Sequence, residues 1–121
     1  MEQEATEYQI VSGVLVIRVQ GELDHHLSKE IRKNTEEIIS EKEIKNLVFD
    51  FEHTTFMDSS GIGLIMGRYK AVREFGGDIY LIGVKEHILR ILLYSGLYKI
   101  TRPCVNLEDV IKQVKEKERV K

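Results

Sequence analysis

The sequence predicts a single α/β domain built on a mixed, mostly parallel β-sheet. Short apolar segments of strand length alternate with segments in which apolar residues recur at helical spacing. A tight-turn signal occurs near the start of the chain, and the connections after it are all short. Together these observations predict the order ββαβαβαβα, with about five strands and about four helices.

Composition is typical of a compact globular domain whose partners are proteins. A chain of 121 residues fits one domain and buries roughly 65% of the surface that its unfolded form exposes. The formal net charge of −2 gives no strong field toward nucleic acid or anionic lipid. The first residues lack the basic start and apolar run of a signal peptide, and no apolar stretch reaches the length of a membrane span. We therefore expect a cytoplasmic protein with no nucleic-acid partner and no membrane partner.

The first two predicted strands form a hairpin. Residues 8–11 and 14–20 are rich in Val, Ile, Leu and Tyr, and they flank Ser12 and Gly13, a pair typical of a two-residue turn. The second strand is apolar on both faces, which indicates that helices cover the sheet. Gly21 is expected to end this strand.

The middle of the chain predicts two helices around one strand. Asp24 is a favourable N-cap, and helical spacing of apolar residues continues from there to about Ile39. Residues 46–51 are strongly apolar and of strand length, and a second helix begins near Asp58 and stops at Gly76. The inner stripe of this second helix is expected to consist of Ile62, Ile65, Met66, Tyr69 and Val72.

The last third of the chain continues the alternation. Residues 79–82 predict a fourth strand, residues 88–92 a short third helix and residues 98–101 a fifth strand. Asn106 begins the last helix, because together with an acidic residue three positions later it resembles a capping box. The charged tail from about residue 115 is expected to fray or to be solvated. The pattern leaves open whether the helices cover one face of the sheet or both.

The most unusual local sequence is FMDSSGIG at residues 56–63, between a strand and a helix. Ser, Asp and Gly are favoured at helix starts, so simple capping explains the segment. The same helix start stabilises an anion by about 0.3 to 1 kcal/mol, so a phosphate on Ser59 would be tolerated. It would add about −1.5 to −2 charge beside Asp58, and near Glu22 and Asp24 if the preceding loop ends at the same sheet edge.

Three glycines and an arginine in the second predicted helix need an explanation. Gly61, Gly63 and Gly67 each cost about 1 kcal/mol relative to alanine inside a helix. Close approach of another backbone would offset this cost, either within the domain or from a docked partner, and we expect packing within the domain. Arg68 is expected on the solvent face, where an arginine also suits a protein interface.

Enzymatic and metal-binding alternatives have weaker sequence support. His25, His26 and His53 lack the spacing of known metal motifs, so no metal and no cofactor are expected. A Ser-His hydrolase using Ser59 stays the second hypothesis, although its local sequence DSSG lacks the first glycine of a nucleophile elbow. Cys104 is the single cysteine, and we interpret it as a packing or surface thiol.

Four segments of the chain resemble the STAS-domain anti-sigma factor antagonists. They are residues 21–26 (GELDHH), 56–63 (FMDSSGIG), 67–70 (GRYK) and 95–100 (SGLYKI). The similarity spans nearly the whole chain. The segments 21–26 and 67–70 are more similar to the sporulation antagonists of this family than to the general-stress antagonists.

The resemblance implies a partner-switching cycle. The unphosphorylated antagonist binds a GHKL-type anti-sigma factor that is also a serine kinase, which sets a sigma factor free. Phosphorylation by that kinase ends the interaction, and a serine phosphatase resets the switch. Because the helix start already accommodates an anion, we predict that phosphorylation acts by local electrostatic and steric exclusion rather than by a large change of shape. The phosphorylated residue of the family is the first serine of Asp-Ser-Ser-Gly, here Ser59.

A general-stress antagonist or a stressosome-like scaffold protein is the alternative within the family. The predicted partner-binding residues are Glu22, Asp24, His25, Asp58, Ser60, Gly61, Gly63 and Arg68.

Overall fold

A central five-stranded sheet organises the computed structural model, which describes residues 6–119. The first two strands of the sheet are antiparallel and every other neighbouring pair is parallel, as the sequence predicts. The spatial order is β1 (Glu7–Val11), β2 (Val14–Arg18), β4 (Asn46–Asp50), β6 (Ile79–Ile82) and β7 (Arg102–Pro103).

The hairpin between β1 and β2 has the predicted two-residue turn. Ser12 has φ of 50° and Gly13 has φ of 79°, and the flanking residues Val11 and Val14 pair with each other. Two consecutive left-handed residues are what a type I′ turn requires, and this turn matches the natural twist of the strands that it joins.

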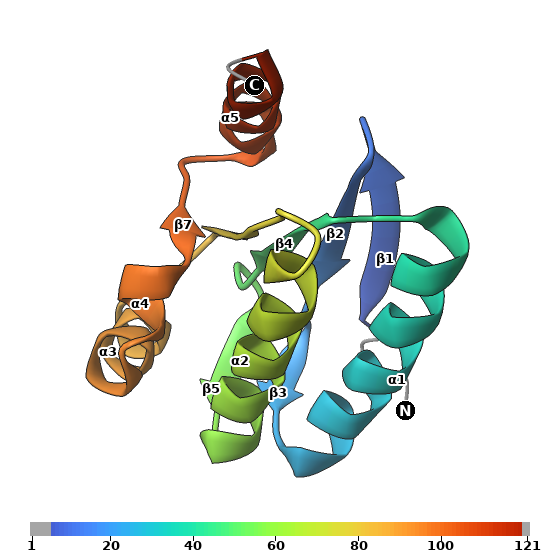
Figure 1. The fold of residues 1–121 in the computed structure, drawn as a ribbon. Helices are drawn as coiled ribbons and strands as arrows, with labels where there is room; N and C mark the ends of the chain where they lie inside the picture. Colours follow the sequence, from blue (N-terminus) through green and yellow to red (C-terminus); the bar gives the residue numbers. More distant parts are fainter. Residues whose placement is uncertain (1–5, 120–121) are drawn as a thin grey trace.

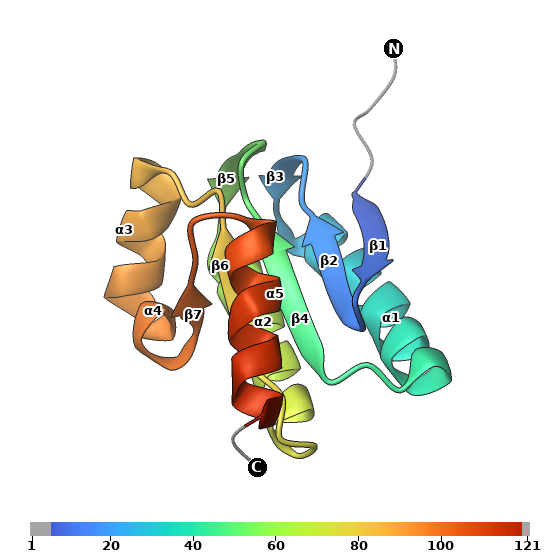
Figure 2. The same cartoon turned by 90° about the horizontal axis from the view of Figure 1, so that it is seen from above.

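Helices cover both faces of the sheet (Figures 1 and 2). The four helices on one face pack on a large apolar cluster, and the last helix packs on a smaller cluster on the other face. The four are α1 (His25–Lys42), α2 (Ser59–Arg73), α3 (Glu86–Ser95) and α4 (Leu97–Ile100), and the last is α5 (Leu107–Arg119). No helix within residues 6–119 combines the length and the apolar character that crossing a bilayer requires.

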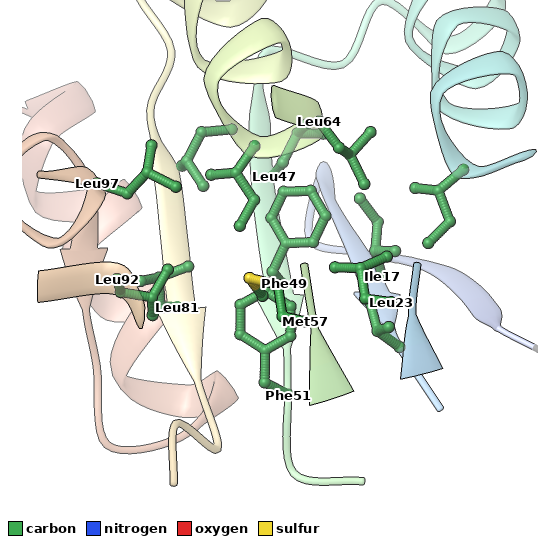
Figure 3. Close-up of a cluster of buried hydrophobic side chains, with 14 of the residues drawn as sticks. Ile17, Leu23, Leu47, Phe49, Phe51, Met57, Leu64, Leu81, Leu92 and Leu97 are labelled. Atoms are coloured by element: carbon green, nitrogen blue, oxygen red, sulfur yellow. The ribbon is translucent and has the colours of Figure 1, made fainter. Parts of the chain in front are cut away.

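The two faces of the central strands separate the core into these clusters. Phe49 faces α1 to α4, where its ring stacks on Phe51 at a centroid distance of 5.7 Å (Figure 3). Its neighbour Val48 belongs to the cluster on the α5 face. Successive strand residues point to opposite faces, so β4 is buried on both sides, and this explains its continuous apolar sequence.

Two short strands were missing from the sequence prediction. β3 (Gly21–Leu23) and β5 (Thr54–Met57) pair in parallel as a separate two-stranded sheet. Gly21 therefore opens a new strand, and its φ of 82° turns the chain out of the main sheet. Strands of three and four residues are too short to show a period in the sequence.

The prediction of a strand at residues 98–101 was wrong. Residues Leu97–Ile100 form the short helix α4, with Leu97 fully buried, and the edge strand β7 follows it. The Thr101 hydroxyl donates to the Leu97 carbonyl oxygen at 2.8 Å, which closes this helical turn. A single turn buries apolar residues as readily as a short strand does, so the sequence pattern could not separate the two.

The charged tail from about residue 115 was predicted to fray or to be solvated. Within residues 115–119 it does not fray, although four of these five residues are exposed to solvent. Helix α5 continues to Arg119, and Lys117 binds the buried carboxylate of Asp78. An ion pair to a buried partner holds the last turn on the domain. The final residues 120–121 of the predicted tail lie outside the described residues.

Candidate functional site

The pair of short strands brings two helix starts together. Leu23 pairs with Met57, and the Asp58 amide donates to the Leu23 carbonyl oxygen at 3.3 Å. Helix α1 starts two residues after Leu23, and α2 starts two residues after Met57. Figure 1 shows both starts at the same end of the domain. The expected proximity of the segment around Asp24 to the segment around Asp58 is therefore confirmed.

Both helix starts are built in the same way. Asp24 and Asp58 are extended residues with ψ of −172°, and each caps the helix that follows it. One Oδ1 atom accepts from the Leu27 amide at 2.9 Å, and the other accepts from the Ser60 amide at 2.8 Å. Capping thus accounts for both aspartates, because a side-chain oxygen satisfies an otherwise free amide.

Ser59 is not explained by capping. It is the exposed first residue of α2, and its hydroxyl takes part in no side-chain hydrogen bond with any residue from 6 to 119. This exposed hydroxyl is therefore not committed to another side chain within the described residues. The hydrolase hypothesis requires a histidine in hydrogen-bond contact with this hydroxyl, and the described residues provide none.

The surroundings of Ser59 combine acidic, aromatic and small residues. Glu22 and Phe56 occupy paired positions in β3 and β5, and both are exposed, with 45% of Phe56 accessible. His25 and Gly63 are exposed at the two helix starts. The sequence analysis did not single out Phe56 as an exposed aromatic residue, because β5 has only four residues and was not predicted as a strand.

The three glycines of α2 have different environments. A Cβ atom on Gly61 would lie 2.7 Å from the Met57 Cγ and 3.0 Å from the Leu23 Cδ2. This glycine therefore packs within the domain as predicted, although against side chains rather than against another backbone. Gly63 and Gly67 have no atom within 4 Å of such a Cβ. The prediction of internal packing was wrong for these two, and they leave part of the outer surface of α2 flat.

Arg68 does not lie on the solvent face, and that expectation was wrong. Its side chain is only 10% exposed and faces α1, where Glu36 lies 3.9 Å away. It follows Ser59 by about 2.5 helical turns, which places it on the opposite side of α2. The long apolar stem of arginine allows this position among apolar neighbours. Burial lowers the pKa of Arg68, although the charge of Glu36 opposes this effect.

The remaining polar candidates do not converge on a metal site. His25 and His26 are exposed at the start of α1, and His53 lies in the turn before β5 with Glu52 3.9 Å away. No group of three or more potential metal ligands forms within the described range 6–119. Cys104 is half-buried, and its sulfur accepts from the Gln113 side-chain amide at 3.3 Å.

This fold, a mixed sheet with helices on both faces and two paired helix starts, defines a small α/β domain of the STAS class. The STAS domain family model matches residues 5–116, and the chain belongs to this family. It is 42% identical to an anti-sigma F factor antagonist from Paenibacillus polymyxa over 73% of this chain and 75% of that protein. It is 30% identical to an anti-sigma-B factor antagonist from Staphylococcus aureus over 67% of this chain and 74% of that protein.

Solved structures of the antagonist SpoIIAA have the same fold. The unphosphorylated form matches with a TM-score of 0.76 at 27% identity, covering 92% of this chain and 98% of that one. The phosphorylated form from Bacillus matches with a TM-score of 0.74 at 31% identity, covering 91% of this chain and 99% of that one. The resemblance of four sequence segments to the STAS-domain anti-sigma factor antagonists is therefore confirmed.

Proposed function

We propose that this chain is an anti-sigma factor antagonist of the sporulation type, switched off by phosphorylation of Ser59. The exposed and uncommitted hydroxyl of Ser59 at the start of α2 is the observation that carries the proposal. The unphosphorylated chain binds an anti-sigma factor that is a GHKL-type serine kinase, and this binding sets a sigma factor free. The kinase then phosphorylates Ser59, and a serine phosphatase restores the binding form. The cycle takes place in the cytoplasm, where sigma factors meet RNA polymerase.

The partner contacts the surface formed by the two helix starts. Glu22, His25 and Gly63 are exposed there and can make direct contacts, and Phe56 adds an apolar anchor that suits an interface. The other predicted partner-binding residues support this surface from within the domain. Asp24, Asp58 and Ser60 fix the helix starts through capping, and Gly61 packs below them. Arg68 is the exception, because it lies on the far side of α2 and faces α1 rather than this surface.

Phosphorylation excludes the partner by charge and size. The Ser60 amide already binds Asp58, and the Asp58 amide already binds Leu23, so neither is free to neutralise a phosphate on Ser59. The new charge therefore acts on the partner surface. A unit charge about 6 Å from a partner carboxylate at an effective dielectric constant near 20 costs roughly 3 kcal/mol. Since about 1.4 kcal/mol changes affinity tenfold, one such contact is sufficient to end binding.

The switch requires no rearrangement of the fold. The match to SpoIIAA is nearly the same for the unphosphorylated form, with a TM-score of 0.76, and for the phosphorylated form, with 0.74. This similarity supports a local mechanism, because a refolded phosphorylated form would match much less well.

Phosphorylation by the cognate kinase tests the site. Incubation with kinase and ATP should place one phosphate on the peptide that contains Ser59, as measured by mass spectrometry. Ser60→Ala, the matched neighbour, should still be phosphorylated, whereas Ser59→Ala should not. Stoichiometric phosphorylation of Ser59→Ala would show that the site is wrong.

Ser59→Asp should weaken kinase binding, and Ser59→Ala should bind and resist release. Equal affinities of both variants would contradict the exclusion mechanism.

The sporulation branch is favoured over the general-stress branch by the higher identity to the anti-sigma F factor antagonist, 42% against 30% for the anti-sigma-B factor antagonist. Affinity capture with the Ser59→Ala chain, followed by mass spectrometry, identifies the kinase that it retains. Retention of a general-stress anti-sigma factor, with no sporulation anti-sigma factor, would move the chain to the alternative branch.

A further inference from the structure

A cleft of about 560 Å³ lies between the C-terminal halves of α1 and α2. Its walls include Ile39, Ile44, Ala71 and Phe75, and the buried side of α2 contributes Arg68. Figure 1 shows α1 and α2 side by side along their length, with Ser59 at the other end of α2. The volume falls within the range of about 300 to 1,000 Å³ that is typical of small-molecule sites.

The charged group in this cleft lacks acceptors. The Arg68 guanidinium makes no hydrogen bond to any part of the chain between residues 6 and 119, and its Nε atom is fully buried without a partner. The carboxylate of Glu36 lies 3.9 Å away, beyond hydrogen-bond distance, and its side chain is 59% exposed. Buried polar groups are normally hydrogen-bonded, because burial of an unsatisfied charge is strongly unfavourable.

We propose that this cleft binds a small organic acid, with its carboxylate on Arg68 and its apolar body against Ile39, Ile44 and Phe75. A carboxylate is the acceptor that best fits the planar fork of a guanidinium, since it accepts two parallel hydrogen bonds. Here these bonds would come from the two terminal nitrogens of Arg68, because its Nε atom is fully buried. Phe75 is 68% exposed, and an apolar ligand would cover its ring. The site is separate from Ser59, so it goes beyond the antagonist function and does not depend on it.

Glu36 competes with such a ligand. Its carboxylate also lines the cleft, and the ligand would have to replace it beside Arg68. Removal of the charge at Glu36 should therefore strengthen binding, whereas removal of the charge at Arg68 should weaken it. If the cleft bound molecules only through apolar contacts, neither change would alter the affinity for the ligand.

Titration of the full-length, ¹⁵N-labelled protein with octanoate tests the proposal by NMR. We expect saturable shifts of amide signals in residues 36–45 and 68–75, and binding of octanamide, which has a similar shape but no charge, at least tenfold weaker. Arg68→Gln should lower octanoate affinity at least tenfold, and Glu36→Gln should raise it severalfold. Equal binding of octanoate and octanamide, or shifts confined to other regions, would overturn the proposal.

Two variants keep the test decisive if Arg68→Gln does not fold. Phe75→Ala removes an exposed ring at the cleft and should lower octanoate affinity severalfold, whereas Tyr94→Ala removes a ring that is 97% exposed on α3 and should leave it unchanged. Unchanged octanoate affinity in both Phe75→Ala and Glu36→Gln would overturn the proposal.

Discussion

The amide of Asp58 donates to the carbonyl oxygen of Leu23 at 3.3 Å, and this bond joins the start of α2 to the end of β3. Leu23 also precedes Asp24, the N-cap of α1, so one backbone bond fixes two helix starts relative to each other. A partner that contacts Ser59 therefore meets a surface made from both starts, and a charge added there acts on the whole of it.

Gly63→Ala separates the stability of the free domain from partner binding. Nothing lies within 4 Å of the position of a Cβ atom on Gly63, so alanine should raise the free energy of unfolding by about 0.5 to 1 kcal/mol through helix propensity. The same methyl group should weaken binding to the kinase, because it projects from the flat face of α2. Urea unfolding and a binding titration measure the two effects.

Gly61→Ala is the matched comparison for this prediction. A Cβ atom there would lie 2.7 Å from the Met57 Cγ, so we expect a loss of about 1 to 3 kcal/mol in the free energy of unfolding from overpacking. Destabilisation by Gly63→Ala comparable with that of Gly61→Ala would show that Gly63 also has a packing role within the domain.

Ser59→Asp tests whether the fold tolerates an anion at the start of α2. The helix dipole favours a negative charge in the first turn, and the neighbouring Asp58 carboxylate opposes it, so the free energy of unfolding should change by less than about 0.5 kcal/mol. Thermal or urea unfolding of the variant measures this. A loss of about 2 kcal/mol or more would mean that phosphorylation acts by disturbing the domain rather than by excluding a partner.

The strands and helices with strong patterns could be predicted from the sequence. β2 and β4 carry continuous apolar residues because both of their faces are buried, and α1 carries a clear cap at Asp24. β3 and β5 could not be predicted, because they have three and four residues and pair only with each other. Their pairing is a long-range contact that no local pattern records.

The candidate site could be predicted only in part. Ser59 and Asp58 follow from the pattern of a helix start, which is local, together with the family resemblance. The burial of Arg68 and the exposure of Gly63 could not be predicted, because apolar residues surround α2 on nearly every side and do not define one inner face. The buried face of α2 is set by its tertiary contacts with α1, α4, β5 and β6.

Cys104 should react slowly in the folded protein. Burial, with a contribution from the charge of Asp109, raises the pKa of Cys104 from 9.0 to about 11. Because the thiolate is the reactive species, alkylation by iodoacetamide at pH 8 should be about 100-fold slower than in the urea-unfolded chain. Asp109→Asn should increase the rate in the folded protein. Equal rates for the folded and unfolded chains would contradict this assignment.

Among the described residues, Asp78 forms ion pairs with three basic side chains through a buried carboxylate. Its side chain is 5% exposed, and it binds Arg73 at 2.9 Å, Arg102 at 3.1 Å and Lys117 of α5. Burial acts to raise the pKa of Asp78, but the hydrogen bond from Lys117 and the charge of Arg102 outweigh it, with help from Arg73, and hold the pKa below its usual value.

Asp78→Asn should therefore make the domain less stable at neutral pH and less sensitive to acid. A carboxylate with a lowered folded-state pKa contributes its stability above the unfolded-state pKa of about 3.9, and that contribution is lost as the pH falls through the folded-state pKa. Since the three cations are partly exposed, we expect a loss of about 2 kcal/mol at pH 7 and a shallower decline in the free energy of unfolding below about pH 4. Urea unfolding at pH 7, 4 and 3 measures both effects.

Glu86→Gln makes the same change of charge in an exposed pair with Arg90 and should cost less than about 0.5 kcal/mol at pH 7. Similar losses in the two variants would show that the buried position of Asp78 adds nothing to its ion pairs.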